Sequence, residues 1–124
     1  MINNKTVLVV DDAAFMRTML KRVIEGAGDY TVEEAPDGEA AIRIYEEKSP
    51  GLVLLDISMP GINGIEVLKQ IMQKDPGACV VMCSAIGQER MIKEAVENGA
   101  SDFIVKPFKP EQIGAALLKA FPAD

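Results

Sequence analysis

The sequence predicts an α/β fold in which helices cover both faces of a five-stranded parallel sheet. Short apolar runs alternate five times along the chain with stretches whose apolar residues recur at helical spacing. All but the second of these runs are continuously apolar, which is typical of parallel strands buried on both faces. The 124 residues, 48% hydrophobic and 26% charged, suit one compact domain over residues 1–124.

The first two units differ in how their strands are patterned. Residues 7–10 form a continuous β-branched run, and an amphipathic helical stripe follows over residues 16–27, which Gly26 and Gly28 are expected to end. Residues 30–35 mix polar and apolar side chains, as an edge strand does.

The remaining units repeat the alternation. Asp37 is an expected N-cap for the second helix, whose apolar positions extend to Tyr45. The later strands and helical stripes are expected at residues 52–55, 67–72, 79–83, 92–99, 103–105 and 113–121. Right-handed crossovers, together with a second strand at the edge, predict the strand order 2-1-3-4-5.

Charge and composition exclude several classes of function. The formal net charge of −6 disfavours nucleic-acid binding, and the longest apolar run, residues 78–83, is too short to span a membrane. No secretory signal precedes the first strand, so we expect a cytoplasmic protein. Cys79 and Cys83 lie four positions apart in one predicted strand, too far for a disulfide, and are expected to be buried, reduced thiols.

Polar side chains follow four of the predicted strands. Asp11 and Asp12 follow the first strand, Asp56 the third, Ser84 the fourth and Lys106 the fifth. In open α/β sheets, ligands bind at the carboxyl ends of the strands, where the strand order reverses, so these groups should converge. Three crowded carboxylates repel one another unless a cation lies between them, and a histidine-free, all-oxygen ligand set suits Mg²⁺.

The central position of Asp56 indicates phosphoryl chemistry. A carboxylate can act as a nucleophile toward phosphorus. We expect the acids on one side of Asp56 and a hydroxyl and an ammonium group, Ser84 and Lys106, on its other side, where they would contact phosphoryl oxygens.

The motifs around these residues resemble the receiver domain of two-component response regulators, of the stand-alone chemotaxis type. The resemblance rests on residues 9–12, 54–61, 84–88 and 106–108 and covers about residues 5–121. It implies a flavodoxin-like, doubly wound (βα)5 sandwich of three layers.

The resemblance also implies a role for each residue of the acidic cluster. Asp56 corresponds to the phosphoacceptor. Asp12 corresponds to the acid that binds Mg²⁺ directly, and Asp11 to the acid that acts mainly through water. Ser58 corresponds to the position whose backbone carbonyl completes the metal site.

Further roles implied by the resemblance belong to the signalling residues. Ser84 corresponds to the switch hydroxyl, Lys106 to the lysine that contacts the phosphoryl group, and Pro107 to a proline after a cis peptide bond. Phe103 corresponds to the switch aromatic, often a tyrosine in chemotaxis regulators. Ala85 corresponds to a small residue that leaves the acceptor accessible.

The function that the resemblance implies is a monomeric signalling protein, not an enzyme proper. Its partners would be a chemotaxis-type sensor histidine kinase, the flagellar motor switch and a phosphatase. A phosphorelay shuttle, or a receiver domain from a longer transcription factor, remains an alternative. An aspartyl phosphatase is disfavoured because Ser58 stands where its general acid is required, and an FMN carrier because Asp11 and Asp12 would repel the phosphate.

Overall fold

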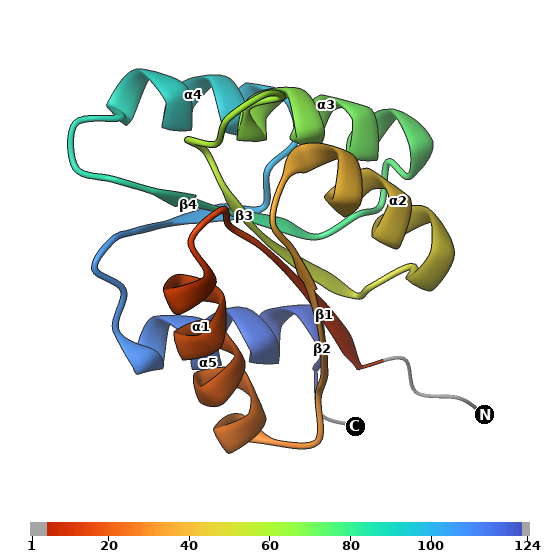
Figure 1. Ribbon diagram of the computed structural model, residues 1–124, viewed down its shortest axis with the longest axis vertical. Coiled ribbons are helices and arrows are strands. Elements are labelled where there is room, and N and C mark those ends of the chain that lie inside the picture. Colours follow the sequence, from red (N-terminus) through yellow and green to blue (C-terminus); the bar gives the residue numbers. More distant parts are fainter. Residues whose placement is uncertain (1–4, 123–124) are drawn as a thin grey trace.

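Strands and helices alternate strictly along the part of the chain that the computed structural model describes, residues 5–122 (Figure 1). The strands are β1 (Thr6–Val10), β2 (Thr31–Ala35), β3 (Leu52–Asp56), β4 (Val80–Ser84) and β5 (Asp102–Val105). The helices are α1 (Ala14–Ala27), α2 (Gly38–Lys48), α3 (Gly64–Lys74), α4 (Glu89–Glu97) and α5 (Pro110–Ala120).

The strands form one parallel sheet in the order β2-β1-β3-β4-β5, which confirms the predicted topology. Figure 1 shows α1 and α5 on one face of this sheet and α2, α3 and α4 on the other. All side chains of β3 and β4 are buried, whereas β2 at the edge buries only Ala35. The mixed composition of residues 30–35 therefore reflects an edge position.

Each face of the sheet has its own apolar core because successive side chains of a strand point to opposite faces. In β3, Val53 and Leu55 pack with residues of α2 and α3, and Leu52 and Leu54 pack with residues of α1 and α5. The two cores hold the strands rigidly between the helical layers, so the carboxyl ends of the strands form a fixed platform.

The observed boundaries correct several expectations by one or two residues. The first helix continues through Gly26 and ends before Gly28. Asp56 and Ser84 are the last residues of β3 and β4, because the sheet pairing extends to Asp56 opposite Cys83 and to Ser84 opposite Val105. These two polar side chains are therefore held by the sheet itself and do not lie on loops.

The two cysteines occupy different environments. Both are free, as expected, but Cys79 precedes β4 and is only half-buried, whereas Cys83 lies inside β4 and is buried. The expectation of two buried thiols was thus right for Cys83 alone, because pairing in β4 begins one residue after Cys79. Within residues 5–122, every helix is too short or too polar to cross a bilayer.

Candidate functional site

An acidic cluster forms where β1 and β3 end side by side. Oxygen atoms of Asp11, Asp12 and Asp56 lie within 4.8 Å of one another. The side chains differ in exposure: Asp11 and Asp56 are buried, at 2% and 5% relative exposure, and Asp12 is exposed to solvent. The structure therefore brings together the three predicted carboxylates, with one of them open to water.

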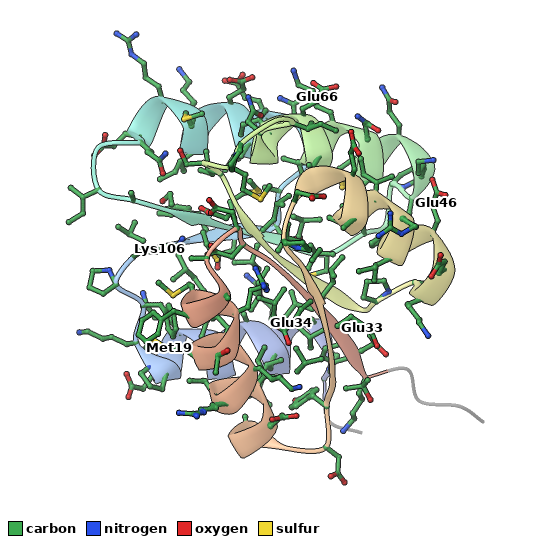
Figure 2. All side chains as sticks on the ribbon, viewed as in Figure 1. Met19, Glu33, Glu34, Glu46, Glu66 and Lys106 are labelled. Carbon is green, nitrogen blue, oxygen red and sulfur yellow. The ribbon has the colours of Figure 1, made fainter. Side chains whose placement is uncertain are left out.

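Lys106 reaches into this cluster from the loop that follows β5. Its Nζ atom lies 3.0 Å from Oδ2 of Asp11 and 3.3 Å from Oδ1 of Asp56, and Figure 2 shows it near the turn between β1 and α1. The expectation that Lys106 would lie on the far side of Asp56 from the acids was wrong, because its stem is long enough to bridge two of them. The Lys106–Pro107 peptide bond is cis, as the resemblance implied.

The electrostatics of the cluster follow from burial and crowding. Burial, with the negative charge of Asp11, raises the pKa of Asp56, although Lys106 and the Ser58 backbone N–H oppose that shift. Burial alone would lower the pKa of Lys106, but its hydrogen bond to Asp11 and the charge of Asp56 outweigh burial and raise it. The site thus holds one ammonium group against three carboxylates and favours a further cation.

The backbone around Asp56 is closely packed. The N–H of Gly64, at the start of α3, donates to the carbonyl of Ile57 at 2.8 Å. A Cβ atom at position 64 would overlap the backbone of Asp56 and Ile57, so only glycine fits there. Asn63 caps α3 through a 3.0 Å hydrogen bond from the Glu66 N–H. The start of α3 therefore packs against the backbone of Asp56 and fixes its position.

Asp11 is held by residues from four directions. Its N–H donates to the Ala35 carbonyl at 3.1 Å, and its Oδ1 accepts from the Ala13 N–H at 2.9 Å. Its backbone carbonyl accepts a 2.6 Å hydrogen bond from Nη1 of Arg17, and Lys106 binds Oδ2. Arg17 was not among the site residues expected from the sequence; the signal for it is a basic residue early in the helix that follows the acid pair.

Ser84 lies in the interior next to this site. It is fully buried, and its Oγ is the one buried side-chain oxygen or nitrogen without a hydrogen-bond partner among the described residues. The next N–H, of Ala85, donates to Oε1 of Gln88 at 2.6 Å. A buried hydroxyl without a partner is rare, because it bears the full cost of its own desolvation.

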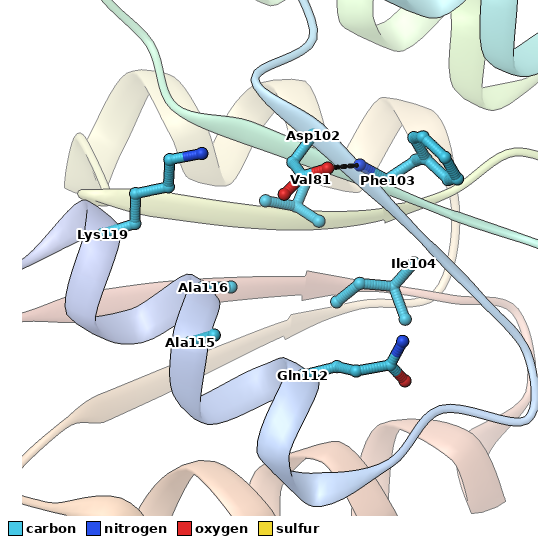
Figure 3. Close-up of a pocket in the computed structure, with 8 residues that line it drawn as sticks. All are labelled: Val81, Asp102, Phe103, Ile104, Gln112, Ala115, Ala116 and Lys119. Carbon is cyan, nitrogen blue, oxygen red and sulfur yellow. Dashed lines mark hydrogen bonds between the residues drawn. The ribbon is translucent and has the colours of Figure 1, made fainter.

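Phe103 lies on β5, the opposite edge of the sheet from β2, and is 44% exposed. Its ring borders a hollow of about 260 Å³ that Ala85, Ile86 and Val105 also line. A second hollow of about 270 Å³ lies between β5 and α5, where Figure 3 shows Phe103 with Ile104, Ala116 and their neighbours. In Figure 3 the ring points away from α5, so of the two hollows it faces the first, which reaches Ala85, the residue after Ser84.

The donor set of the acidic cluster fits a hard divalent cation. It consists of carboxylate oxygens without histidine or thiol, and such oxygens are the ligands that Mg²⁺ prefers. Ser58 is exposed, and its backbone N–H favours the charged form of Asp56, which lowers the pKa of that carboxyl. A contribution of its carbonyl to metal binding stays a prediction.

Comparison with known proteins agrees with this arrangement. Residues 7–118 match the family described as the response regulator receiver domain. The chain is 51% identical over 115 residues to the chemotaxis protein CheY of Thermotoga maritima, across 93% of this chain and 96% of that protein. It is 50% identical over 113 residues to the chemotaxis protein CheY of Listeria monocytogenes, across 91% and 95%.

Solved structures share the fold. The Vibrio cholerae chemotaxis protein CheY4 superposes with a TM-score of 0.87 at 27% sequence identity, over 96% of this chain and 100% of that one. The flavodoxin-like sandwich implied by the sequence is thus confirmed.

Proposed function

Because the chain belongs to the family of response regulator receiver domains, we propose that it carries a signal as a phosphoryl group on Asp56. The observation that supports this most directly is the position of Asp56: a buried carboxylate with a raised pKa, 3.3 Å from Lys106 and beside two further acids. In this proposal the donor is a phosphohistidine on a chemotaxis-type sensor kinase.

The transfer is a displacement at phosphorus. A carboxylate oxygen of Asp56 forms a bond to phosphorus while the bond between phosphorus and the histidine nitrogen breaks. The nitrogen leaves with the bonding electron pair and takes a proton from water, and Asp56 becomes an acyl phosphate. Water later attacks the phosphorus, releasing inorganic phosphate and restoring the carboxylate.

The other residues of the site stabilise charge in this step. Asp11, Asp12 and Asp56, with the Ser58 carbonyl, would hold Mg²⁺, which when bound supplies positive charge to the phosphoryl oxygens. Lys106 stands close enough to Asp56 to donate a hydrogen bond to the incoming group. Ser84, whose hydroxyl has no partner among the described residues, gains one in a phosphoryl oxygen.

The output in this proposal is binding, not catalysis of a separate reaction. Two of the similar proteins are named chemotaxis protein CheY, so the flagellar motor switch is the proposed target and the cytoplasm the proposed location. A phosphatase resets the signal, and the protein acts as a monomer that binds no nucleic acid. The acidic net charge of −6 supports the last point.

Phe103 is the residue through which, in this proposal, phosphorylation at Asp56 changes the surface of the protein. Movement of Ser84 toward the phosphoryl group draws the loop after β4 inward, and the ring then enters the adjoining hollow of about 260 Å³. An aromatic side chain buries roughly 150–250 Å², so covering an exposed ring contributes about 2 kcal/mol at ~25 cal/mol per Å². A change of that size shifts a two-state population by more than tenfold.

Two measurements test the proposal. Incubation with acetyl phosphate and Mg²⁺ should add one phosphoryl group, visible by mass spectrometry, and a chain that stays unmodified contradicts the proposed chemistry. A pull-down with the flagellar switch protein should succeed only with beryllofluoride and Mg²⁺ present. Equal capture with and without beryllofluoride contradicts the motor as the regulated target.

Structures with and without beryllofluoride test the route of the signal. The Phe103 ring is expected to turn inward and the Ser84 loop to shift. If neither moves, the chemistry at Asp56 can stand, but the signal leaves the site by another path.

A further inference from the structure

Arg17 connects the acidic cluster to the edge of the sheet. It lies on α1, and its Nε atom donates to Oε1 of Glu34 on β2 at 3.2 Å. Its Nη1 atom donates to the backbone carbonyl of Asp11 at 2.6 Å. The Arg17 side chain is only 16% exposed, so this contact is sheltered from water. Glu34, labelled on β2 in Figure 2, accepts from the guanidinium nitrogen nearest the stem, and the terminal Nη1 binds Asp11.

The carbonyl that Arg17 binds belongs to the peptide bond between Asp11 and Asp12. The orientation of this carbonyl therefore sets the direction in which the backbone of Asp12 leaves β1. Asp12 is exposed, and no hydrogen bond of its own side chain to the described residues holds it. The Arg17 contact is therefore placed to orient the acid that faces solvent.

We propose that Arg17, held by Glu34, is a positioning residue that aims Asp12 at the divalent cation. This inference rests on the proposed function, because it requires that the cluster bind Mg²⁺. It adds a role for two residues that do not themselves contact the cation. Groups that orient metal ligands in this way typically change metal affinity by roughly 10–100-fold when they are removed.

A purely electrostatic role for Arg17 predicts different results. If only its charge mattered, Arg17→Gln would strengthen Mg²⁺ binding, because a positive charge beside the cation is removed. Arg17→Lys would leave the affinity unchanged. Positioning instead requires the planar, forked guanidinium, which a lysine cannot replace when two acceptors must be bound together. Both substitutions should then weaken binding.

The experiment is calorimetric titration of the full chain with MgCl2, paired with thermal unfolding in the absence of Mg²⁺. Arg17→Lys and Arg17→Gln should each raise the Mg²⁺ dissociation constant about tenfold, and Glu34→Gln should raise it less. The matched control is Lys69→Gln, which removes an exposed ion pair with Glu94 at 3.8 Å between α3 and α4. The control should leave the dissociation constant unchanged.

Each other outcome overturns the inference in a recognisable way. A lower melting temperature with an unchanged dissociation constant means that Arg17 only stabilises the fold. Tighter binding by Arg17→Gln means that charge alone acts. If the unsubstituted chain binds no Mg²⁺, the proposed function fails first and this inference with it. If Arg17→Gln does not fold, an unchanged dissociation constant in both Arg17→Lys and Glu34→Gln overturns the inference.

Discussion

The two ends of the sheet differ in how well their polar side chains are paired. At the carboxyl ends of the strands, three carboxylates share one lysine and a buried hydroxyl has no partner among the described residues. Burial and a neighbouring charge raise the pKa of Asp56 there. This end keeps groups whose mutual repulsion and desolvation cost stability.

At the amino ends of the strands, the polar groups form hydrogen bonds with one another. The Tyr45 hydroxyl donates to Oδ2 of Asp75 at 2.7 Å, and the Gly77 N–H donates to Oδ1 of the same carboxylate at 3.1 Å. Burial and this partnership raise the pKa of Tyr45 far above its usual value. The rings of Tyr30 and Phe121 also contact each other there, with centroids 5.5 Å apart and their planes tilted by 50°.

The difference shows where this fold tolerates unfavourable interactions. The apolar cores and the amino end supply stability, so the carboxyl end can hold like charges and an unpaired hydroxyl in place for a ligand. Local departures from good pairing in an otherwise consistent fold are expected at functional sites. Substitutions at the two ends should therefore have opposite effects on stability and on ligand binding.

The largest effect is expected for Asp56→Asn. The variant should fold but accept no phosphoryl group from acetyl phosphate, because an amide is not a nucleophile toward phosphorus. A phosphorylated variant in mass spectrometry would contradict the assignment of the acceptor. The exposed Asp29→Asn is the control and should be phosphorylated normally.

The same variant has a pH signature. Because the pKa of Asp56 is raised in the fold, the folded state binds this proton more tightly than the unfolded state. Its contribution to stability is therefore greatest below its ordinary pKa and is lost as pH rises through the folded value. Without Mg²⁺ at pH 7, Asp56→Asn should be more stable than the unsubstituted chain in urea. If the variant and the unsubstituted chain have the same free energy of unfolding at every pH from 4 to 7, this prediction is wrong.

Asp12→Ala separates metal binding from stability. Loss of this carboxylate should weaken Mg²⁺ binding by roughly tenfold or more in a calorimetric titration. Asp12 is exposed, so in the absence of Mg²⁺ the free energy of unfolding should change by less than about 0.5 kcal/mol. An unchanged Mg²⁺ affinity would remove Asp12 from the site.

The two cysteines report on the two ends of β4. Burial raises the pKa of Cys83 from 9.0 to about 12; the charge of Lys106 opposes this shift, and the carboxylates of Asp56 and Asp11 add to it. At pH 8 a thiol reagent should label the half-buried Cys79 and spare Cys83 until the protein unfolds. Peptide mapping of the label distinguishes the two sites, and equal labelling in the native state would contradict the burial of Cys83.

The raised pKa of Cys83 also affects alkaline stability. Since the folded state holds this proton more tightly, the contribution of Cys83 is fully present below pH 9.0 and is lost toward pH 12. The unsubstituted chain should therefore lose more stability over that range than Cys83→Ala. If both proteins lose the same free energy of unfolding in urea over this pH range, another group is responsible.

The smallest effect is expected at the amino end. Tyr45→Phe leaves Asp75 without its hydroxyl partner and should lower the free energy of unfolding by about 1 kcal/mol. Mg²⁺ affinity should not change, because α2 presents this residue at the other end of the sheet. Tyr30→Phe is the control, since the Tyr30 hydroxyl makes no hydrogen bond within residues 5–122. A weaker Mg²⁺ affinity in Tyr45→Phe would mean that the two ends are coupled.

Much of the fold and the membership of the site could be predicted from the sequence. The alternation of apolar runs and helical stripes, and the mixed second strand, were enough to predict the strand order. Asp11, Asp56 and Ser84 each end an apolar run, and parallel strands place such ends at one edge of a sheet. Local pattern sufficed because the period of a strand or helix is set within the segment itself.

The tertiary structure alone decided how those residues interact. Nothing in the pattern shows that Asp12 faces water while Asp11 is buried. Nor does it show that Lys106 binds Asp56 and also Asp11, which lies 95 positions away in the sequence. The same holds for the contacts of Arg17 with Asp11 and Glu34. These arrangements depend on side-chain directions at the ends of separate strands, which the packing of α1 and the loops sets. A sequence pattern specifies which element a residue occupies, but not which atoms of distant elements come within hydrogen-bond distance.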